Sequence, residues 1–202
     1  LGTILDEATQ MKKDMTNKTI VIGIGKGGIS AMNYLYPKAQ EEGTEFLSID
    51  SDSETLKHSA TPHKIKVGNK LVDGAGCYQN YSLGAACVYS NKRKISNFIK
   101  GSVDIIILVS LGGGISSGGI VSLLKFISDQ NIYTRVIYTM PFEFERNIRN
   151  NNARKALKEI KRYANKSIFV KICSDEKISL GELFLQFDIL MVRLAIRELN
   201  DF

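Results

Sequence analysis

The amino-acid sequence predicts one α/β domain, in which helices cover both faces of a parallel β-sheet and a long helix comes last. Apolar runs of strand length alternate with stretches of helical spacing, and this order is typical of parallel strands joined by helical crossovers. The chain has 202 residues, of which 44% are hydrophobic. A chain of this length supports one sizeable core rather than two.

Strands are expected where short apolar runs lie between glycine and polar residues, and helices where apolar residues recur every three or four positions. The expected strands are 19–24, 45–49, 103–109, 134–139 and 167–172. The expected helices are 29–40, 82–99, 120–129, 150–164 and the partly buried 180–199. Residues 1–17 are expected to form an N-terminal extension or a short helix, and residues 18–202 the folded domain.

Composition excludes several classes of protein. No run approaches the roughly 18 apolar residues of a membrane-spanning helix, and no secretory signal is present. The three cysteines, Cys77, Cys87 and Cys173, form no CxxC pair, which favours reduced thiols and a cytoplasmic location. His58 and His63 do not have the spacing of a helical ligand pair, so no protein-bound metal is expected.

The net charge of +6 is concentrated in one segment, because residues 145–166 carry eight Lys or Arg and only two Glu. A basic face can bind nucleic acid or an acidic partner. No aromatic stacking residues are interleaved with these charges, so nucleic acid is not expected. A solvated helix face and a docking surface for an acidic partner at residues 146–166 both remain open.

The first expected strand runs directly into a glycine-rich loop, where Gly23, Gly25 and Gly28 fit the pattern GxGxxG. Such a loop lets unpaired amides at a helix N-terminus approach a phosphate. Asp50 ends the second strand 22 residues after Gly28, where a dinucleotide-binding fold places the acid that binds the ribose. An oxidoreductase domain that binds NAD is therefore one interpretation.

A second glycine-rich loop favours a different nucleotide. The apolar strand 103–109 is followed by five glycines within residues 112–119, and a helix is expected at once after them. Close packing of this helix on the sheet would explain one or two of these glycines. Two amide-rich loops at neighbouring strand ends would grip a polyphosphate from both sides, which suits a nucleoside triphosphate.

Five segments together resemble the nucleotide-binding segments of the FtsZ/tubulin family in order and spacing: IGIGKGGISAMNYL, EFLSIDSD, DGAGCYQNYSLGAA, VSLGGGISSGG and TMPFEFERNIR. The segment LGGGISSG is similar to the family's signature loop GGGTGTG. The resemblance covers about residues 18–199 and implies a Rossmann-like GTPase domain that ends in a long core helix. It also implies GTP or GDP as the ligand, Mg²⁺ held through the phosphates, and a homo-oligomer or an FtsZ-like partner.

The resemblance further implies which residues contact the nucleotide. The ribose or base side would contact Glu145, with Arg149 as a nearby cation. Phe184 would pack on the base, and the Asp188 carboxylate would accept hydrogen bonds from N1 and the exocyclic amine of guanine, which adenine does not offer. The remaining expected contacts, mostly with phosphates, are Gly25, Lys26, Gly27, Gly28, Asp50, Gly112, Gly113, Gly114, Ser116, Ser117 and Gly118.

The sequence departs from the family pattern mostly near the terminal phosphate. Lys26 interrupts the first glycine loop, where it would add a cation. Ile115 removes a hydroxyl from the signature loop. Ser116 replaces a glycine, which would cost about 1 kcal/mol if the backbone there were left-handed. Other departures are Ser30 and Asp50, which replace asparagines, and Tyr78, which stands where glycine is expected.

The family's catalytic loop and its second, C-terminal domain have no counterpart in these 202 residues. The preferred hypothesis is a self-associating, FtsZ-like guanine-nucleotide-binding protein that hydrolyses GTP only if a catalytic loop is supplied beyond residue 202 or by a partner. The alternatives are a degenerate, non-hydrolysing interaction module and the NAD-binding oxidoreductase domain.

Overall fold

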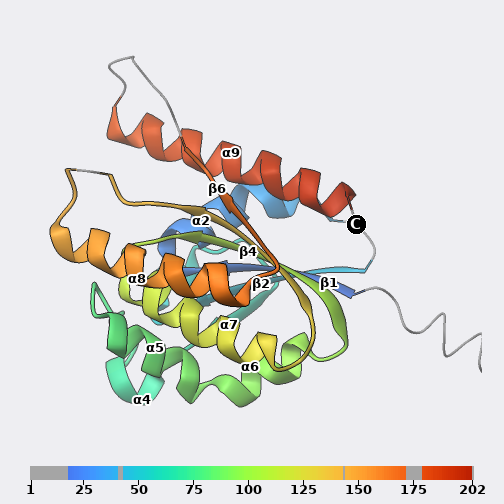
Figure 1. Ribbon diagram of the computed structural model, residues 1–202, viewed down its shortest axis with the longest axis horizontal. Coiled ribbons are helices and arrows are strands. Elements are labelled where there is room, and N and C mark those ends of the chain that lie inside the picture. The colour runs from blue at the N-terminus through green and yellow to red at the C-terminus, as the bar shows by residue number, and fades with distance from the viewer. Residues whose placement is uncertain (1–17, 41–42, 143, 172–178, 202) are drawn as a thin grey trace, which may run out of the picture.

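The computed structural model describes residues 18–40, 43–142, 144–171 and 179–201 (Figure 1). The expected N-terminal segment 1–17 lies outside these residues. The strands form one parallel six-stranded sheet with the order β3-β2-β1-β4-β5-β6. Their bounds are β1 Lys18–Ile24, β2 Thr44–Asp50, β3 His63–Lys66, β4 Ser102–Ser110, β5 Tyr133–Thr139 and β6 Lys166–Phe169.

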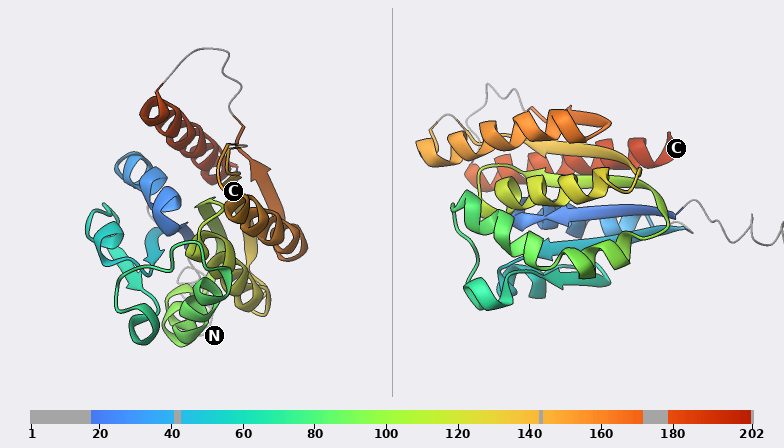
Figure 2. Two further views of the ribbon diagram at one scale, coloured as in Figure 1. Left: turned by 90° about the vertical axis from the view of Figure 1, so that its left-hand side faces the viewer. Right: turned by 60° about the horizontal axis from the view of Figure 1, so that its bottom comes forward.

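Helices cover both faces of the sheet, as the sequence predicts (Figure 2). One face carries α5 Tyr81–Ser90, α6 Lys92–Ile99, α7 Ile120–Ser128 and α8 Asn147–Tyr163, and the other carries α2 Gly25–Leu35, the 3-10 turn η1 Tyr36–Lys38 and α9 Leu180–Asn200. Short helices α3 Ser53–Lys57 and α4 Asn69–Val72 flank β3, and a π-helical turn, η2 Gly114–Gly119, precedes α7.

The side chains of each central strand pack alternately against the two helical layers, because successive residues of a strand point to opposite faces. On β1, Ile20 and Ile22 pack under α5–α8, whereas Val21 packs under α2 and α9. On β4, Ile105 and Ile106 separate in the same way. The strands are therefore apolar on both faces, which is why they read as continuous apolar runs in the sequence.

Several predicted boundaries were wrong. The helix expected at 29–40 begins earlier, at Gly25, so Gly25, Gly27 and Gly28 lie inside it, whereas Gly23 lies on β1. The helix expected at 82–99 is two helices, because Asn91 ends α5 with its side chain bonded to the Cys87 carbonyl and then begins α6. Strand β3, an edge strand of four residues, was not predicted. The end expected for the last strand, residue 172, lies outside the described residues.

A buried ionic network joins the C-terminal end of α9 to the amino ends of β4, β5 and β6. Arg135 on β5 is paired with Asp104 on β4 and with Glu198 on α9, and all three residues are at most 3% exposed. Lys166 on β6 lies 2.7 Å from Glu198. Burial raises the pKa of Asp104, and Arg135 opposes this rise. The network holds α9 on the sheet at the edge opposite the glycine loops.

Candidate nucleotide site

A cavity of about 610 Å³ opens at the carboxyl edge of the sheet, between the ends of β1, β2, β4 and β5 and the helix α9. Strand β1 has β2 on one side and β4 on the other, so the crevice lies where the strand order reverses, the usual ligand position in such sheets. Ten predicted site residues line the cavity: Gly25, Lys26, Gly27, Asp50, Gly113, Ser116, Glu145, Arg149, Phe184 and Asp188.

The first glycine loop presents a helix N-terminus to the cavity. Helix α2 begins at Gly25, whose φ of +74° places it in the left-handed region that favours glycine. No side chain caps the helix, and no acid lies in its first turn. In this register the N–H groups of Gly25, Lys26 and Gly27 have no intrahelical acceptor. The positive end of the helix dipole therefore faces the cavity beside three available donors.

Gly28 has a different role from the predicted phosphate contact. It is buried and does not line the cavity. A Cβ at this position would overlap the backbone carbonyl of Leu108 on β4. In helical register its N–H is the first with an intrahelical acceptor, the Ile24 carbonyl. Gly28 thus lets α2 pack closely on the sheet, which keeps the N-terminus of α2 at the cavity.

The second glycine loop is mostly bonded to the protein itself. The N–H groups of Gly112 and Gly113 donate to the hydroxyls of Ser117 and Ser116, at 2.8 and 3.1 Å. The Gly114 N–H donates to the Tyr78 carbonyl at 2.7 Å. Gly112, Gly114, Ser117 and Gly118 do not line the cavity. These positions therefore shape the loop, and Gly113 and Ser116 face the space beside it.

Packing explains two of the inner glycines. A Cβ at Gly118 would overlap the Tyr81 carbonyl of α5, and one at Gly114 would lie 2.7 Å from the Asn80 carbonyl oxygen. Both glycines therefore have a packing role, but the close contact is with the N-terminal end of α5 and not, as the sequence had suggested, with the sheet.

Two residues that depart from the family pattern, Ser116 and Tyr78, differ in their backbone conformation. Ser116 is not among the residues with positive φ, so the strain considered for a serine at this position does not arise. Tyr78 does adopt a left-handed φ of +47°, in agreement with the glycine expected there. The two loops are also close to each other, because a Cβ at Gly25 would lie 2.9 Å from the Ser116 Cβ.

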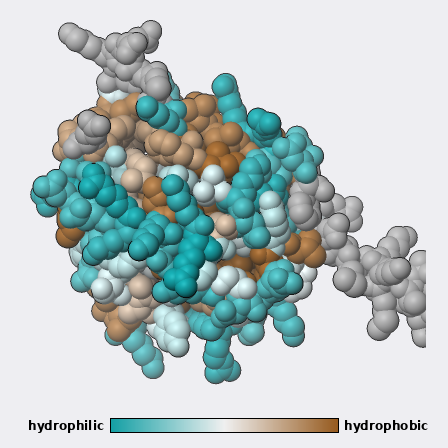
Figure 3. Space-filling view, viewed as in Figure 1, coloured by the Kyte–Doolittle hydropathy of each residue, from teal (hydrophilic) through white to brown (hydrophobic). Residues whose placement is uncertain are grey.

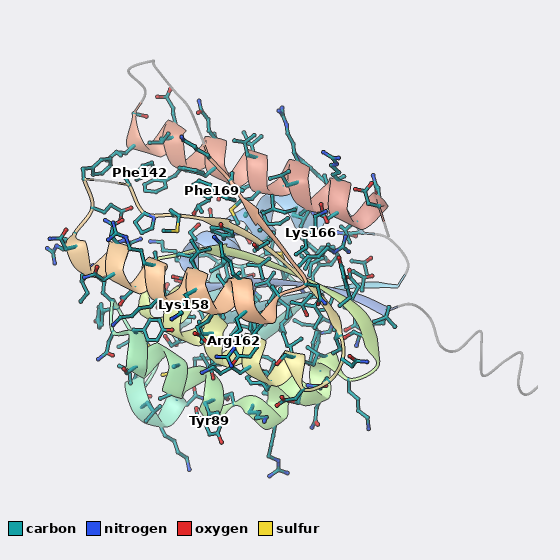
Figure 4. All side chains as sticks on the ribbon, viewed as in Figure 1. Tyr89, Phe142, Lys158, Arg162, Lys166 and Phe169 are labelled. Atoms are coloured by element: carbon teal, nitrogen blue, oxygen red, sulfur yellow. The ribbon has the colours of Figure 1, made fainter. Side chains whose placement is uncertain are left out.

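Aromatic rings from two segments form the opposite end of the cavity. Phe142 follows β5, and its ring centre lies 5.9 Å from that of Phe184 and 5.6 Å from that of Phe187, both on α9. Figure 4 shows Phe142 beside the N-terminal end of α9. Phe184 is 55% exposed although it lines the cavity. A flat heterocycle would cover this apolar surface and stack on a ring.

Asp188 lies one helical turn beyond Phe184 and is 9% exposed. Its Oδ2 accepts a hydrogen bond of 2.6 Å from the Ser30 hydroxyl on α2. Burial raises the pKa of Asp188 to about 6, and the Ser30 hydrogen bond opposes this rise. At pH 7 the group is therefore mostly a carboxylate, which can accept further hydrogen bonds from a ligand in the cavity.

Three further charged residues line the walls. Glu145 precedes α8 and pairs with Arg149 on that helix, and its Oε1 accepts the Phe142 N–H at 2.9 Å. Asp50 is 5% exposed, and its Oδ1 accepts the N–H groups of Ser51 and Asp52 at 2.6 and 3.0 Å. Burial raises the pKa of Asp50. The Asp50 side chain thus faces the cavity as an anchored acid.

The described residues contain no group of three or more His, Cys, Asp or Glu side chains that could hold a metal ion. Asp50 and Asp52 are close in sequence, but both accept hydrogen bonds from neighbouring residues, which for Asp52 are Glu54 and Thr55. This donor set does not fit a divalent ion held directly by the protein, because Mg²⁺ requires a near-octahedral oxygen shell.

The sequence interpretation assigned no contact to several residues of the cavity. Ser30 was noted only as a replacement for asparagine, and its bond to Asp188 joins residues 158 positions apart. Phe142 and Phe187 complete the aromatic end. In the sequence Phe142 is close to Glu145, and Phe187 is close to Phe184. That the segment after β5 contacts α9 is a feature of the tertiary structure alone.

Comparisons with known proteins identify the family of this chain. The family model described as "Tubulin/FtsZ family, GTPase domain" matches residues 18–171. The chain is 28% identical over 176 residues to the cell division protein FtsZ of Aquifex aeolicus, covering 85% of this chain and 48% of that protein. It is 32% identical over 151 residues to FtsZ of Mycoplasmopsis pulmonis, covering 74% and 38%. The chain thus spans about half the length, or less, of these curated relatives.

Solved structures show the same fold. An empty FtsZ dimer from M. jannaschii has a TM-score of 0.82 at 23% identity, covering 93% of this chain and 55% of that one. CetZ2 from Haloferax volcanii, in a GTPgS-bound protofilament, has a TM-score of 0.78 at 23% identity, covering 87% and 56%. None of the helices in the part of the chain that the structure describes combines the length and the hydropathy of a membrane-spanning segment.

Proposed function

Because this chain belongs to the tubulin/FtsZ family, we propose that it binds GTP or GDP in the cavity at the carboxyl edge of the sheet. One observation carries the proposal: a single cavity joins two glycine loops at one end to Phe184 and Asp188 at the other. The loops supply amides for phosphates, and the far end supplies a ring and a buried carboxylate for a base.

Asp188 makes guanine the preferred base. A carboxylate only accepts hydrogen bonds, and guanine presents two adjacent donors, its N1–H and its exocyclic amine. Adenine presents an acceptor at N1, which would face the carboxylate unfavourably. The buried position of Asp188 strengthens this discrimination, because a misplaced acceptor there could not be replaced by bulk water.

The proposal includes self-association with further copies or with an FtsZ-like partner in the cytoplasm. Hydrolysis would occur only if a catalytic loop is supplied beyond residue 202 or by a partner. The alternative, a non-hydrolysing interaction module, is supported by α8. Its exposed residues include Arg154, Lys155, Lys158, Lys161 and Arg162. Figure 3 shows a hydrophilic surface on this side of the molecule, and Figure 4, in the same view, labels Lys158 and Arg162 on α8. An acidic partner would fit this face.

Calorimetry with GDP, GTP, ADP and NAD tests nucleotide binding. Guanine nucleotides are expected to bind at micromolar or weaker dissociation constants, and the other two more weakly. Gly113→Val is expected to abolish binding, because the new side chain enters the cavity beside Ser116. The fold should tolerate it, since the φ of −79° and ψ of 172° at Gly113 are accessible to valine.

Gly181→Val on α9 serves as the matched control, because a Cβ there meets only the Ser179 hydroxyl at 4.0 Å. Preference for NAD, or no binding of any of the four ligands at millimolar concentration, would contradict the proposed function. Unchanged affinity in Gly113→Val would show that the second loop does not touch the ligand.

The purified 202-residue chain is expected to hydrolyse GTP barely above the uncatalysed rate. Phosphoryl transfer requires a positioned water and compensation of the charge that develops on the phosphate. The cavity carboxylates Asp50, Glu145 and Asp188 already accept hydrogen bonds from the protein. Phosphate release at increasing protein concentration measures this, and turnover that rises with concentration would show that the chain completes its own catalytic site.

A further inference from the structure

Taken together, the charges that line the cavity do not favour the binding of a polyphosphate. Four carboxylates line it, and the only cations that line it from the described residues are Lys26 and Arg149. Arg149 is paired with Glu145 and is therefore largely neutralised. A nucleoside diphosphate or triphosphate brings several negative charges. Beside the loop amides, a cation that is not already paired would further stabilise its phosphate end.

Lys26 is placed to meet this requirement. It is the second residue of α2, between Gly25 and Gly27, and its side chain is exposed at the cavity. It forms no ion pair with any residue that the structure describes. Lys26 therefore lies at the N-terminus of α2, where the first N–H groups have no intrahelical acceptor, and its neighbour Gly25 is close to Ser116 of the second loop.

A divalent ion is the usual alternative source of positive charge at bound phosphates. In this cavity the carboxylates are hydrogen-bonded within the chain and form no ligand cluster among the described residues. Such an ion would be held by phosphate and water oxygens alone. Its contribution would then be mainly charge neutralisation, which a lysine ammonium also provides as a point charge.

We propose that Lys26 binds the nucleotide phosphates and supplies the positive charge that a divalent cation would otherwise supply, so that this chain binds guanine nucleotides without requiring one. The inference rests on the proposed function, because it concerns the same cavity. Lys26 thereby selects ligands that carry phosphates and makes their binding insensitive to metal removal.

Calorimetry of GDP binding in excess Mg²⁺ and in EDTA tests the inference with four proteins, namely wild type, Lys26→Ala, Lys26→Arg and the control Lys38→Ala. The wild type and Lys38→Ala, an exposed lysine just after the same helix, are expected to bind equally in both buffers. Lys26→Ala is expected to bind about tenfold more weakly in EDTA, the size of one charge-assisted hydrogen bond. Mg²⁺ should recover most of that loss, and Lys26→Arg should bind like the wild type.

The outcomes separate the two proposals. Loss of wild-type binding in EDTA, or wild-type affinity of Lys26→Ala in EDTA, would overturn the role of Lys26 and leave guanine-nucleotide binding intact. A weakened Lys26→Ala that Mg²⁺ does not restore would show that Lys26 contributes something other than charge, which also overturns the inference. No GDP binding by any of the four proteins in either buffer would overturn the proposed function itself.

Discussion

Asp188→Asn is expected to weaken GDP binding roughly 100-fold at pH 7, because guanine would lose the charged acceptor of two hydrogen bonds. Each hydrogen bond to a charged group contributes about 1.5–3 kcal/mol. Asparagine presents an amide donor beside the guanine donors. Affinity for ADP should change much less. Isothermal titration with both nucleotides measures the loss of preference.

The same carboxylate predicts how binding depends on pH. Burial raises the pKa of Asp188 to about 6 in the free protein. Only the ionised form accepts both guanine donors, so GDP affinity should be full well above the pKa and fall as the pH decreases through about 6. Titrations between pH 5 and 8, a range that brackets this pKa, would detect the change. A flat profile would show that Asp188 does not contact the base.

The free energy of unfolding should depend on pH in the opposite direction to GDP affinity. A raised folded-state pKa contributes stability that is present below the ordinary value of 3.8 and is lost as the pH rises through about 6. At pH 7 the buried carboxylate therefore destabilises the protein without nucleotide. Asp188→Asn should raise its free energy of unfolding, by up to about 3 kcal/mol. Asp201→Asn, at the exposed end of the same helix, is the matched control and should change neither property appreciably.

Arg135→Met is expected to lower the free energy of unfolding by about 3–5 kcal/mol, because it leaves two buried carboxylates without their shared cation. This is a large part of the stability of an ordinary domain. Lys166 would still neutralise part of the Glu198 charge, whereas Asp104 forms no ion pair with any other cation in the described part of the chain. Urea denaturation at pH 7 measures the loss.

The penalty of Arg135→Met should shrink on acidification. The pKa of Asp104 is raised by burial and held down by Arg135, so without Arg135 it rises further. The carboxylate then binds a proton at a higher pH, and the cost of burying its charge disappears as the pH falls. Arg197→Met removes an exposed pair with Asp201 and should cost less than about 1 kcal/mol. A similar loss in both variants would contradict the structural role of the network.

The elements predicted best from the sequence are those with a long and clear local pattern of apolar residues. The β1, β4 and β5 strands are long apolar runs, so their approximate positions and the parallel sheet were predicted correctly. Short or capped elements were predicted worst. Strand β3 has four residues on a sheet edge, and the break between α5 and α6 depends on hydrogen bonds of Asn91 that a helical pattern does not reveal.

The sequence by itself determined the fold class and the family, because alternating apolar segments and ordered glycine motifs are local features of a chain. Only the tertiary structure decided what each glycine does. Gly25 and Gly28 look alike in the sequence, yet Gly25 lines the cavity and Gly28 packs against the carbonyl of Leu108. Likewise, Asp188 becomes a buried acceptor only because α9 packs beside Ser30 on α2. Burial and hydrogen bonding depend on neighbours far away in the sequence, and a local pattern does not contain them.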